Sequence, residues 1–373
     1  MKYPFPFLSL LIFFQFCSIA NKEELELDEI NLVVVDSLAI DHLGKLYIID
    51  AKENHSEFLL YDEFTKEFFR VNKSGIILQK VNLTGEGKDN YQSDYFLTAH
   101  YLDSGEILVE TFGYQFIYDK EFNLKEKRKT PLSPITKQIM GSTVNLPIGE
   151  FMFSSAFKID ENRDSFSKSF GVGYPLLTSY KIGDFSIQAR TTFPEKSQMV
   201  LNPGSYNFDS PFAVYHKDKL YINFSSSPEI YVYDFPSMKQ LRYIPLQPGE
   251  SYKQNTPSDP NENFGSFFNK LASSTYEGFN FSNGYMITWY KGAAPQDEVD
   301  ALPRNVVGQP EFQALQKKYE KYHYQIFKDE KKLWEGYIDV KLKSVRNMIF
   351  SETKIGDKED EAERIMKCSI SMN

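Results

Sequence analysis

The stretch Leu38–Phe69 reads LAIDHLGKLYIIDAKENHSEFLLYDEFTKEFF and sets the pattern of the whole chain. Short runs of Leu, Ile, Tyr and Phe alternate with polar residues, and Gly, Asn, Asp and Ser clusters separate them. This alternation, broken by residues that favour turns, is typical of β-hairpins. The stretch therefore predicts antiparallel β-sheet rather than helix.

The same pattern returns elsewhere in the chain. Phe212–Leu241 (FAVYHKDKLYINFSSSPEIYVYDFPSMKQL) and Ala99–Lys127 (AHYLDSGEILVETFGYQFIYDKEFNLKEK) also end a strand in Tyr-Asp, and Leu176–Arg190 is a weaker copy. Steps of 57, 62 and 53 residues separate the aligned tyrosines, which are Tyr61, Tyr118, Tyr180 and Tyr233. In this alignment two histidines, His42 and His216, occupy equivalent turns. A unit of this size holds too few strands to bury both faces of its own sheet, so the units must stack.

The repeat spacing predicts an all-β fold, a six-bladed β-propeller of antiparallel sheets. The last unit has only about 30 residues after Lys343, enough for two or three strands. Glu26–Val35, with its run of valines, is expected to supply the missing strand and close the ring. A seven-bladed ring and a β-helix remain the alternative architectures.

Gly292–Lys321 interrupts the regular spacing of the repeats and is interpreted as an insertion. A short helix is expected near residues 310–322, because Pro310 suits a first helical turn. One apolar face of this helix carries Phe312, Leu315, Tyr319 and Tyr322, and these are the candidate binding residues. The helix either packs on the ring or serves as a lid or docking element, since long insertions on repeat scaffolds often carry function.

The N-terminus resembles an export signal. Lys2 precedes the apolar run Phe5–Phe16, which is too short for a membrane-spanning helix of roughly 20 residues. Cleavage after Ala20 would leave one propeller domain, residues 21–373. Cys17 lies where a bacterial lipoprotein carries its lipidated cysteine, so lipidation of Cys17 and simple cleavage both remain open. Either outcome places the protein in the periplasm or at the outer membrane or cell surface.

Composition narrows the class of partner. The chain has 42 basic and 51 acidic residues, a net charge of −9, which argues against nucleic acid as a partner. Its 32 Phe and 24 Tyr are interpreted as strand formers that pack between sheets. After cleavage, Cys368 would be the single thiol, so the core must be stable without a disulfide.

No pattern in the sequence assigns a catalytic residue. The five histidines lack zinc-ligand spacing, so neither a metal site nor a cofactor is expected. Asp160, Asn162 and Asp164 resemble the start of a calcium loop, but Ser165 stands where that loop needs glycine. A membrane contact is expected only through a lipid anchor at the N-terminus.

The export signal, the blades that end in Tyr-Asp turns and the segment Gly284–Gly292 (GYMITWYKG) before the insertion carry a family resemblance. The chain resembles a group of exported, often lipid-anchored bacterial propeller proteins, related to TolB-like and NHL-like six-bladed propellers. The resemblance implies fold and location, not activity.

These features favour a non-catalytic scaffold of the bacterial envelope that binds a protein, a peptide or a glycan. The alternative is a polysaccharide-active hydrolase or lyase on the same scaffold, because propellers host both kinds of function. We would abandon the binding hypothesis if three or more His, Asp or Glu side chains converged at one end of the channel around a buried cleft, which would argue for an enzyme. Aromatic residues beside carboxylates in one groove would favour the hydrolase or lyase.

Overall fold

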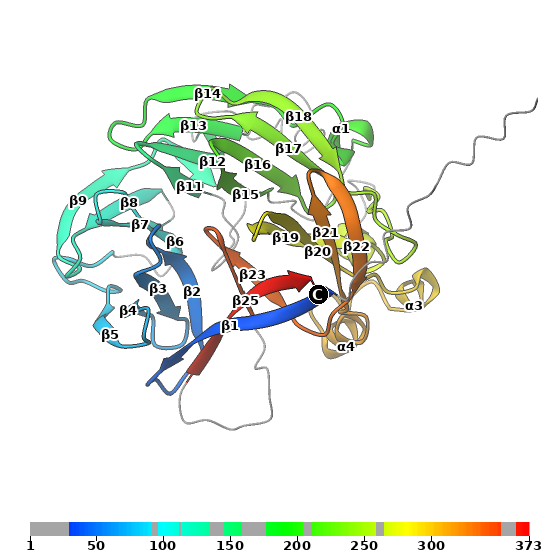
Figure 1. The fold of residues 1–373 in the computed structure, drawn as a ribbon, viewed down its shortest axis with the longest axis horizontal. Helices are drawn as coiled ribbons and strands as arrows, with labels where there is room; N and C mark the ends of the chain where they lie inside the picture. Colours follow the sequence, from blue (N-terminus) through cyan, green and yellow to red (C-terminus); the bar gives the residue numbers. More distant parts are fainter. Residues whose placement is uncertain are drawn as a thin grey trace, which may run out of the picture.

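The computed structural model describes residues 30–91, 96–111, 113–134, 145–158, 177–203, 211–258, 265–351 and 363–372. Within them, six antiparallel sheets stand as blades around a common centre (Figure 1). The prediction of a six-bladed β-propeller is thereby confirmed over the seven-bladed and β-helical alternatives.

Each blade runs from an inner strand at the channel to an outer strand at the rim. Blade 1 consists of β2 (Leu46–Ala51), β3 (Glu57–Asp62), β4 (Glu67–Asn72) and β5 (Ile77–Asn82). Blade 2 consists of β6 (Phe96–Tyr101), β7 (Ile107–Thr111), β8 (Tyr114–Tyr118) and β9 (Leu124–Lys129). Blade 3 splits its inner edge between β10 (Leu132–Pro134) and β11 (Asn145–Ile148), followed by β12 (Phe151–Lys158), β13 (Leu177–Lys181) and β14 (Ile187–Thr191).

Blades 4 and 5 repeat the plan of four strands. Blade 4 consists of β15 (Pro211–His216), β16 (Lys219–Phe224), β17 (Glu229–Asp234) and β18 (Lys239–Pro245). Blade 5 consists of β19 (Thr275–Ser282), β20 (Tyr285–Lys291), β21 (Tyr322–Lys328) and β22 (Lys331–Tyr337).

Blade 6 combines both ends of the described chain. The C-terminal part supplies β23 (Leu342–Val345), β24 (Met348–Ser351) and β25 (Glu363–Met372), and the outer strand is β1 (Ile30–Ile40). Strand β1 pairs with β25 in antiparallel register from Ile30 opposite Met372 to Ile40 opposite Glu363. The predicted closure of the ring by the N-terminal segment is confirmed from Ile30 onward, and residues 26–29 lie outside the described residues.

Six separate apolar clusters lie between neighbouring blades, one at each interface. Aromatic rings fill much of this space: Phe68 of blade 1 meets Phe96 of blade 2 edge to face, with ring centroids 5.0 Å apart. Pairs with this geometry add stability beyond the area they bury. The abundance of Phe and Tyr is therefore accounted for by packing between sheets.

The repeat alignment was wrong by one strand in the first blade. Tyr61 and Asp62 end the second strand, β3, whereas Tyr118 ends the third strand of blade 2 and Tyr233 lies in the third strand of blade 4. Consequently His42 precedes blade 1, while His216 ends the inner strand of blade 4, and the two are not equivalent.

An aspartate can cap the turn after any strand of a blade, which explains why the repeats were aligned one strand out of place in blade 1. The Asp62 carboxylate accepts backbone N–H bonds from Phe64 and Thr65, just as Asp119 accepts them from Glu121 and Asn123. The true counterpart of Asp119 in blade 1 is Asn72, which caps the turn after the third strand.

The described part of the chain has four short helices besides the blades: α1 (Gln198–Leu201), α2 (Gly265–Leu271), α3 (Gln296–Asp300) and α4 (Pro310–Lys318). Helices α3 and α4 lie in the insertion Gly292–Lys321 and pack against α2 in an apolar cluster of their own. The predicted helix is confirmed at its start but ends earlier, because Tyr322 already belongs to β21, which pairs with β20. None of the described helices is long and apolar enough to cross a membrane.

Candidate functional site

Two hollows lie on opposite faces of the ring. The first, here called the channel cleft, is lined by residues of the inner strands β2, β6, β11, β15 and β23 and has a volume of about 130 Å³. The second, here called the insertion cavity, lies between α2 and the insertion and has a volume of about 490 Å³. They lie on opposite faces because successive turns of an antiparallel sheet alternate between its two ends.

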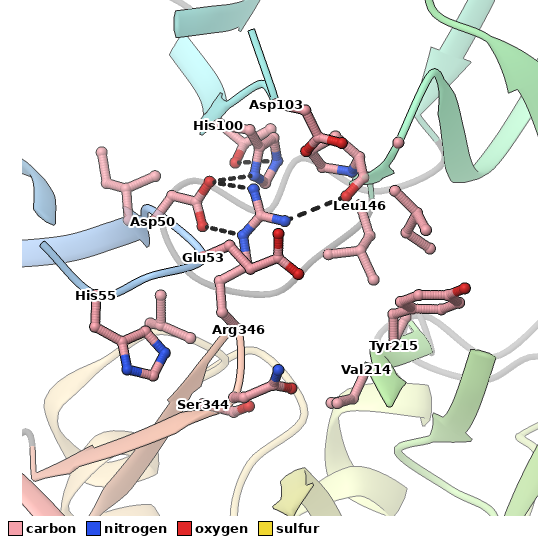
Figure 2. Close-up of a pocket in the computed structure, with 18 of the residues that line it drawn as sticks. Asp50, Glu53, His55, His100, Asp103, Leu146, Val214, Tyr215, Ser344 and Arg346 are labelled. Carbon is pink, nitrogen blue, oxygen red and sulfur yellow. Dashed lines mark hydrogen bonds and ion pairs between the residues drawn. The ribbon is translucent and has the colours of Figure 1, made fainter. Parts of the chain in front are cut away.

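Arg346 closes the channel cleft. It lies in the tight turn between β23 and β24, with a φ of +51°. Its Nε and Nη2 atoms donate to the two carboxylate oxygens of Asp50, at 2.7 and 2.9 Å (Figure 2). Further bonds reach the backbone carbonyls of Tyr101, at 2.9 Å, and Pro147, at 3.2 Å. One guanidinium thus joins blade 6 to blades 1, 2 and 3.

Asp50 is ionised in this setting, although its side chain is only 4% exposed. Burial alone would raise the pKa of Asp50, but Arg346 and His100 outweigh that effect and hold the pKa well below its usual range. Because the folded pKa lies below the unfolded value of about 3.9, the pair stabilises the fold above that pH. Its contribution is lost only as the pH falls further, toward the folded pKa.

Acidic and histidine side chains converge in the channel cleft, namely Asp50, Glu53, His55, His100 and Asp103. Such convergence would argue for an enzyme, but the most buried members are committed to one another. Asp50 is paired with Arg346, and His100 lies 3.5 Å from Asp50 and 3.2 Å from Thr98. The volume is also below the roughly 300–1,000 Å³ of typical ligand sites. We therefore interpret the cluster as a set of contacts that stabilises the ring by joining its blades.

The described residues offer no metal centre in this cleft or elsewhere: within them, no three His, Cys, Asp or Glu side chains are arranged to hold an ion.

The insertion cavity has the size and lining of a ligand site. Its volume falls within the range that small-molecule pockets occupy. Phe267 of α2 faces it, together with Phe312 and Tyr319 of the insertion, and α4 adds the side-chain amides of Gln313 and Gln316. Apolar rings beside a few polar groups are the usual composition of a site that orients its ligand.

Charged groups line the same cavity. The lysines are Lys270, Lys291 and Lys341, and the carboxylates are Glu277 and Glu320. Burial would raise the pKa of Glu320, but the hydroxyl of Tyr322, at 2.7 Å, and the ammonium of Lys291, at 3.4 Å, lower it on balance. Glu320 is therefore an ionised group in the wall of the cavity.

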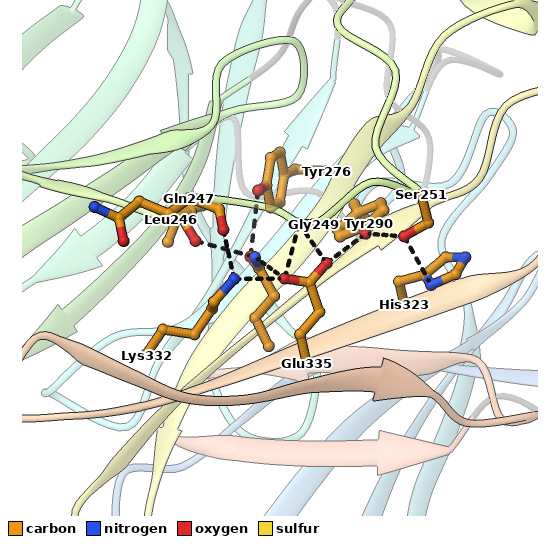
Figure 3. Close-up of polar contacts among 10 residues, drawn as sticks. Leu246, Gln247, Gly249, Ser251, Tyr276, Tyr290, His323, Lys332 and Glu335 are labelled. Atoms are coloured by element: carbon orange, nitrogen blue, oxygen red, sulfur yellow. Dashed lines mark hydrogen bonds and ion pairs between the residues drawn. The ribbon is translucent and has the colours of Figure 1, made fainter. Parts of the chain in front are cut away.

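Glu335 fixes the loop that leads into α2. Its carboxylate accepts the backbone N–H of Gly249 at 2.8 Å, the hydroxyl of Tyr290 at 2.7 Å and the amide of Gln325 at 3.0 Å (Figure 3). The ammonium of Lys332 lies 2.8 Å away. These contacts tie the segment after β18 to blade 5.

Ser251 and His323 belong to the same network. The Ser251 hydroxyl lies 2.7 Å from the Tyr290 hydroxyl and 3.4 Å from Nδ1 of His323. The imidazole stacks on the Tyr290 ring, with centroids 5.1 Å apart. The arrangement holds a loop in place.

Replacing Glu335 by glutamine is expected to lower the free energy of unfolding by about 2 kcal/mol, because the amide cannot accept bonds at both of its ends. Burial raises the pKa of Glu335, but its donors lower it on balance, so the wild-type contribution is present above the unfolded pKa and is lost as the pH falls. Urea unfolding at pH 7 measures the change. The control is Glu330→Gln at an exposed ion pair with Arg242, which should cost less than about 1 kcal/mol. Equal losses of stability in Glu335→Gln and Glu330→Gln would contradict the conclusion that Glu335 holds this loop.

The predicted binding residues lie at the insertion. Phe312 is buried, Leu315 and Tyr319 are half-buried in the cluster with α2, and Tyr322 is buried in β21. Phe312, Tyr319 and Tyr322 also line the insertion cavity, whereas Leu315 only packs. Their part in binding stays a prediction. Cys17 and the segment before it lie outside the described residues.

Sequence reasoning did not find Arg346, Asp50 or the contribution of α2. Asp50 and Arg346 are 296 positions apart in the chain, so no local spacing connects them. The available signal was a lone arginine in the two-residue turn between the last hairpin strands. For α2, the available signal was the pair Phe267-Phe268 near the end of Pro248–Asn269, a stretch rich in Pro, Asn and Ser between blades 4 and 5.

Comparison with known proteins shows the fold and no activity. No protein-family model and no curated protein matches this chain. Among solved structures, it is similar to a member of the DUF4221 family from Bacteroides vulgatus, with a TM-score of 0.64, 12% identity, and coverage of 93% of this chain and 100% of that one. It is also similar to a "Putative exported protein" from Bacteroides fragilis, with a TM-score of 0.55, 11% identity, and coverage of 92% and 95%. These structure neighbours agree with the resemblance to exported bacterial propellers, and at such identities they establish a shared fold.

Proposed function

We propose that this protein is an exported, non-catalytic binding propeller of the bacterial envelope that holds a glycan or peptide segment of a partner in the insertion cavity. Export is supported by the apolar run Phe5–Phe16 ahead of Ala20 and by the name of the structure neighbour from Bacteroides fragilis. Retention at a membrane through Cys17, in the periplasm or at the cell surface, is part of the same proposal.

The observation that carries the proposal is the insertion cavity itself. It combines a volume of about 490 Å³ with rings from α2 and α4 and with side-chain amides on one exposed helix face. A repeat scaffold provides a rigid ring, and its longest insertion is where a ligand site is expected. The cavity is built from α2, the insertion and one end of blade 5.

A hydrolase or lyase is the second candidate, because Glu277 and Glu320 line one aromatic cavity, as a glycoside-cleaving pair would. Such chemistry needs one carboxylic acid that stays protonated near neutral pH. Glu320 has a lowered pKa. Burial raises the pKa of Glu229 to about 7, but this residue begins β17 and does not line the cavity. Glu320 therefore does not supply that protonated acid.

The test compares two tryptophan variants of α4. Gln316→Trp places a bulky side chain in the cavity, whereas Lys317→Trp adds the same bulk on a position that does not line it. Immobilised protein, residues 21–373, is exposed to envelope extract and to a glycan array. We expect ligands captured by the wild type to bind Gln316→Trp at least tenfold more weakly and Lys317→Trp unchanged.

Equal capture by both variants would place the ligand elsewhere and contradict the proposal. Capture of nothing by the wild type would also contradict it. Appearance of shortened glycan products or new reducing ends would replace the binding function with the hydrolase or lyase.

A further inference from the structure

We infer that the outer edge of blade 6 pairs with a second copy of this chain, through two β1 strands that run antiparallel across a two-fold axis. β1 is the outer strand of its blade and, among the described strands, it pairs only with β25. The outer strand of a sheet leaves one row of backbone N–H and C=O groups unpaired, and this row can accept another strand. The pairing is independent of the insertion cavity and of its ligand.

The outer strands of the other five blades carry basic side chains, which protect such an edge from pairing. These are Lys80 in β5, Lys125, Lys127, Arg128 and Lys129 in β9, Arg190 in β14, Lys239 and Arg242 in β18, and Lys331 and Lys332 in β22. The sequence of β1, INLVVVDSLAI, contains neither lysine nor arginine. With 11 residues it is also longer than the other outer strands, which have five to seven. Of the six described blades, blade 6 therefore has the unprotected outer edge.

Three consecutive valines are exposed on this edge: Val33 is 38%, Val34 39% and Val35 54% exposed. Successive side chains of a strand point to opposite faces, so the run exposes apolar surface on both faces of the sheet. The exposed large apolar residues of the other outer strands include no two that are adjacent in sequence; they are Leu78, Ile187, Leu241, Tyr243 and Tyr337. Further along β1, Leu38 and Ile40 are buried against blade 1. The part of the edge that needs a cover is therefore Val33–Val35.

A second copy of β1 fits this edge. In an antiparallel pair centred on Val34, the two Val34 side chains lie opposite each other and Val33 of each copy lies opposite Val35 of the other, so apolar groups cover apolar groups. The single charged residue of β1 is Asp36, two positions from the centre. The two Asp36 residues are then about 13 Å apart along the strands, beyond the screening length of about 8 Å, so they do not oppose the pairing. Because a two-fold contact uses the same edge of both copies, assembly ends at a dimer.

The experiment is sedimentation equilibrium of residues 21–373 over a wide range of protein concentration. We expect the mass to rise from one chain to two as the concentration increases, and hydrogen exchange of the Val33–Val35 amides to slow in the dimer. Val34→Lys should weaken dimerisation at least tenfold, because two ammonium groups would face each other at the centre of the contact. Leu241→Lys makes the same kind of change at a side chain 42% exposed on the outer strand β18, and it should leave dimerisation unchanged. Circular dichroism checks that each variant is folded, and Val35→Lys replaces Val34→Lys if that variant does not fold.

A single chain at every concentration would overturn the inference. A dimer that is as stable in Val34→Lys as in the wild type, or that is weakened equally by Leu241→Lys, would overturn it as well, because the contact would then lie elsewhere. Pairing of β1 with a strand of a different envelope protein, while this chain stays monomeric, would replace the second copy as the occupant and also contradict the inference.

Discussion

Replacing Arg346 by alanine is expected to lower the free energy of unfolding by about 3–5 kcal/mol, the range found when one partner of a buried ion pair is removed. The side chain of Asp50 is 4% exposed, and without Arg346 its charge remains buried with only His100 and the Tyr101 N–H as partners. The carbonyls of Tyr101 and Pro147 also lose a donor. Urea unfolding, followed by circular dichroism at pH 7, measures the loss.

Two comparisons isolate the buried pair. Arg242→Ala breaks an ion pair with Glu330 whose side chains are 45% and 44% exposed, and it should cost less than about 1 kcal/mol. The double replacement Arg346→Met with Asp50→Leu removes both charges, and it should recover most of the stability, since no buried charge is left unpaired. If Arg346→Ala lowers the free energy of unfolding no more than Arg242→Ala does, the ion pair in the channel cleft does not hold the blades together.

The propeller could be predicted because its signal is local and repeated. Similar strands and turns recur along the chain, so the spacing of the tyrosines predicted the number of blades. The position of each strand within its blade, from the inner to the outer edge, could not be predicted in the same way. Asp62 and Asp119 both cap a turn by accepting backbone N–H bonds, yet one turn follows the second strand and the other follows the third.

The candidate site was predictable only in part. The helix at Pro310 and the packing face with Phe312 follow from helical periodicity. The cavity itself depends on α2, which lies in a different connection of the chain from the insertion. A sequence pattern does not predict which two connections will pack against each other. The end of the helix at Lys318 likewise depends on the pairing of Tyr322 with Lys291 across β20 and β21.

Closure of the ring also depends on one glycine. Gly75 lies in the turn between β4 and β5 with a φ of +83°, and a Cβ added there would come within 2.1 Å of the backbone oxygen of Ala39. Ala39 belongs to β1, the strand that completes blade 6. We expect Gly75→Ala to lower the free energy of unfolding by about 3 kcal/mol, from left-handed backbone strain of about 1–2 kcal/mol and a clash that backbone atoms cannot relieve easily.

Gly105 provides the matched control. It has the same φ of +83° in the turn between β6 and β7, but an added Cβ would meet nothing within 4 Å. Gly105→Ala therefore carries the backbone strain without the clash and should cost about 1–2 kcal/mol. The difference between the two variants measures the contact of blade 1 with the closing strand. Hydrogen exchange of β1 amides should quicken in Gly75→Ala alone, because the clash loosens that strand, and equal stability losses in the two variants would show that this contact does not hold the seam.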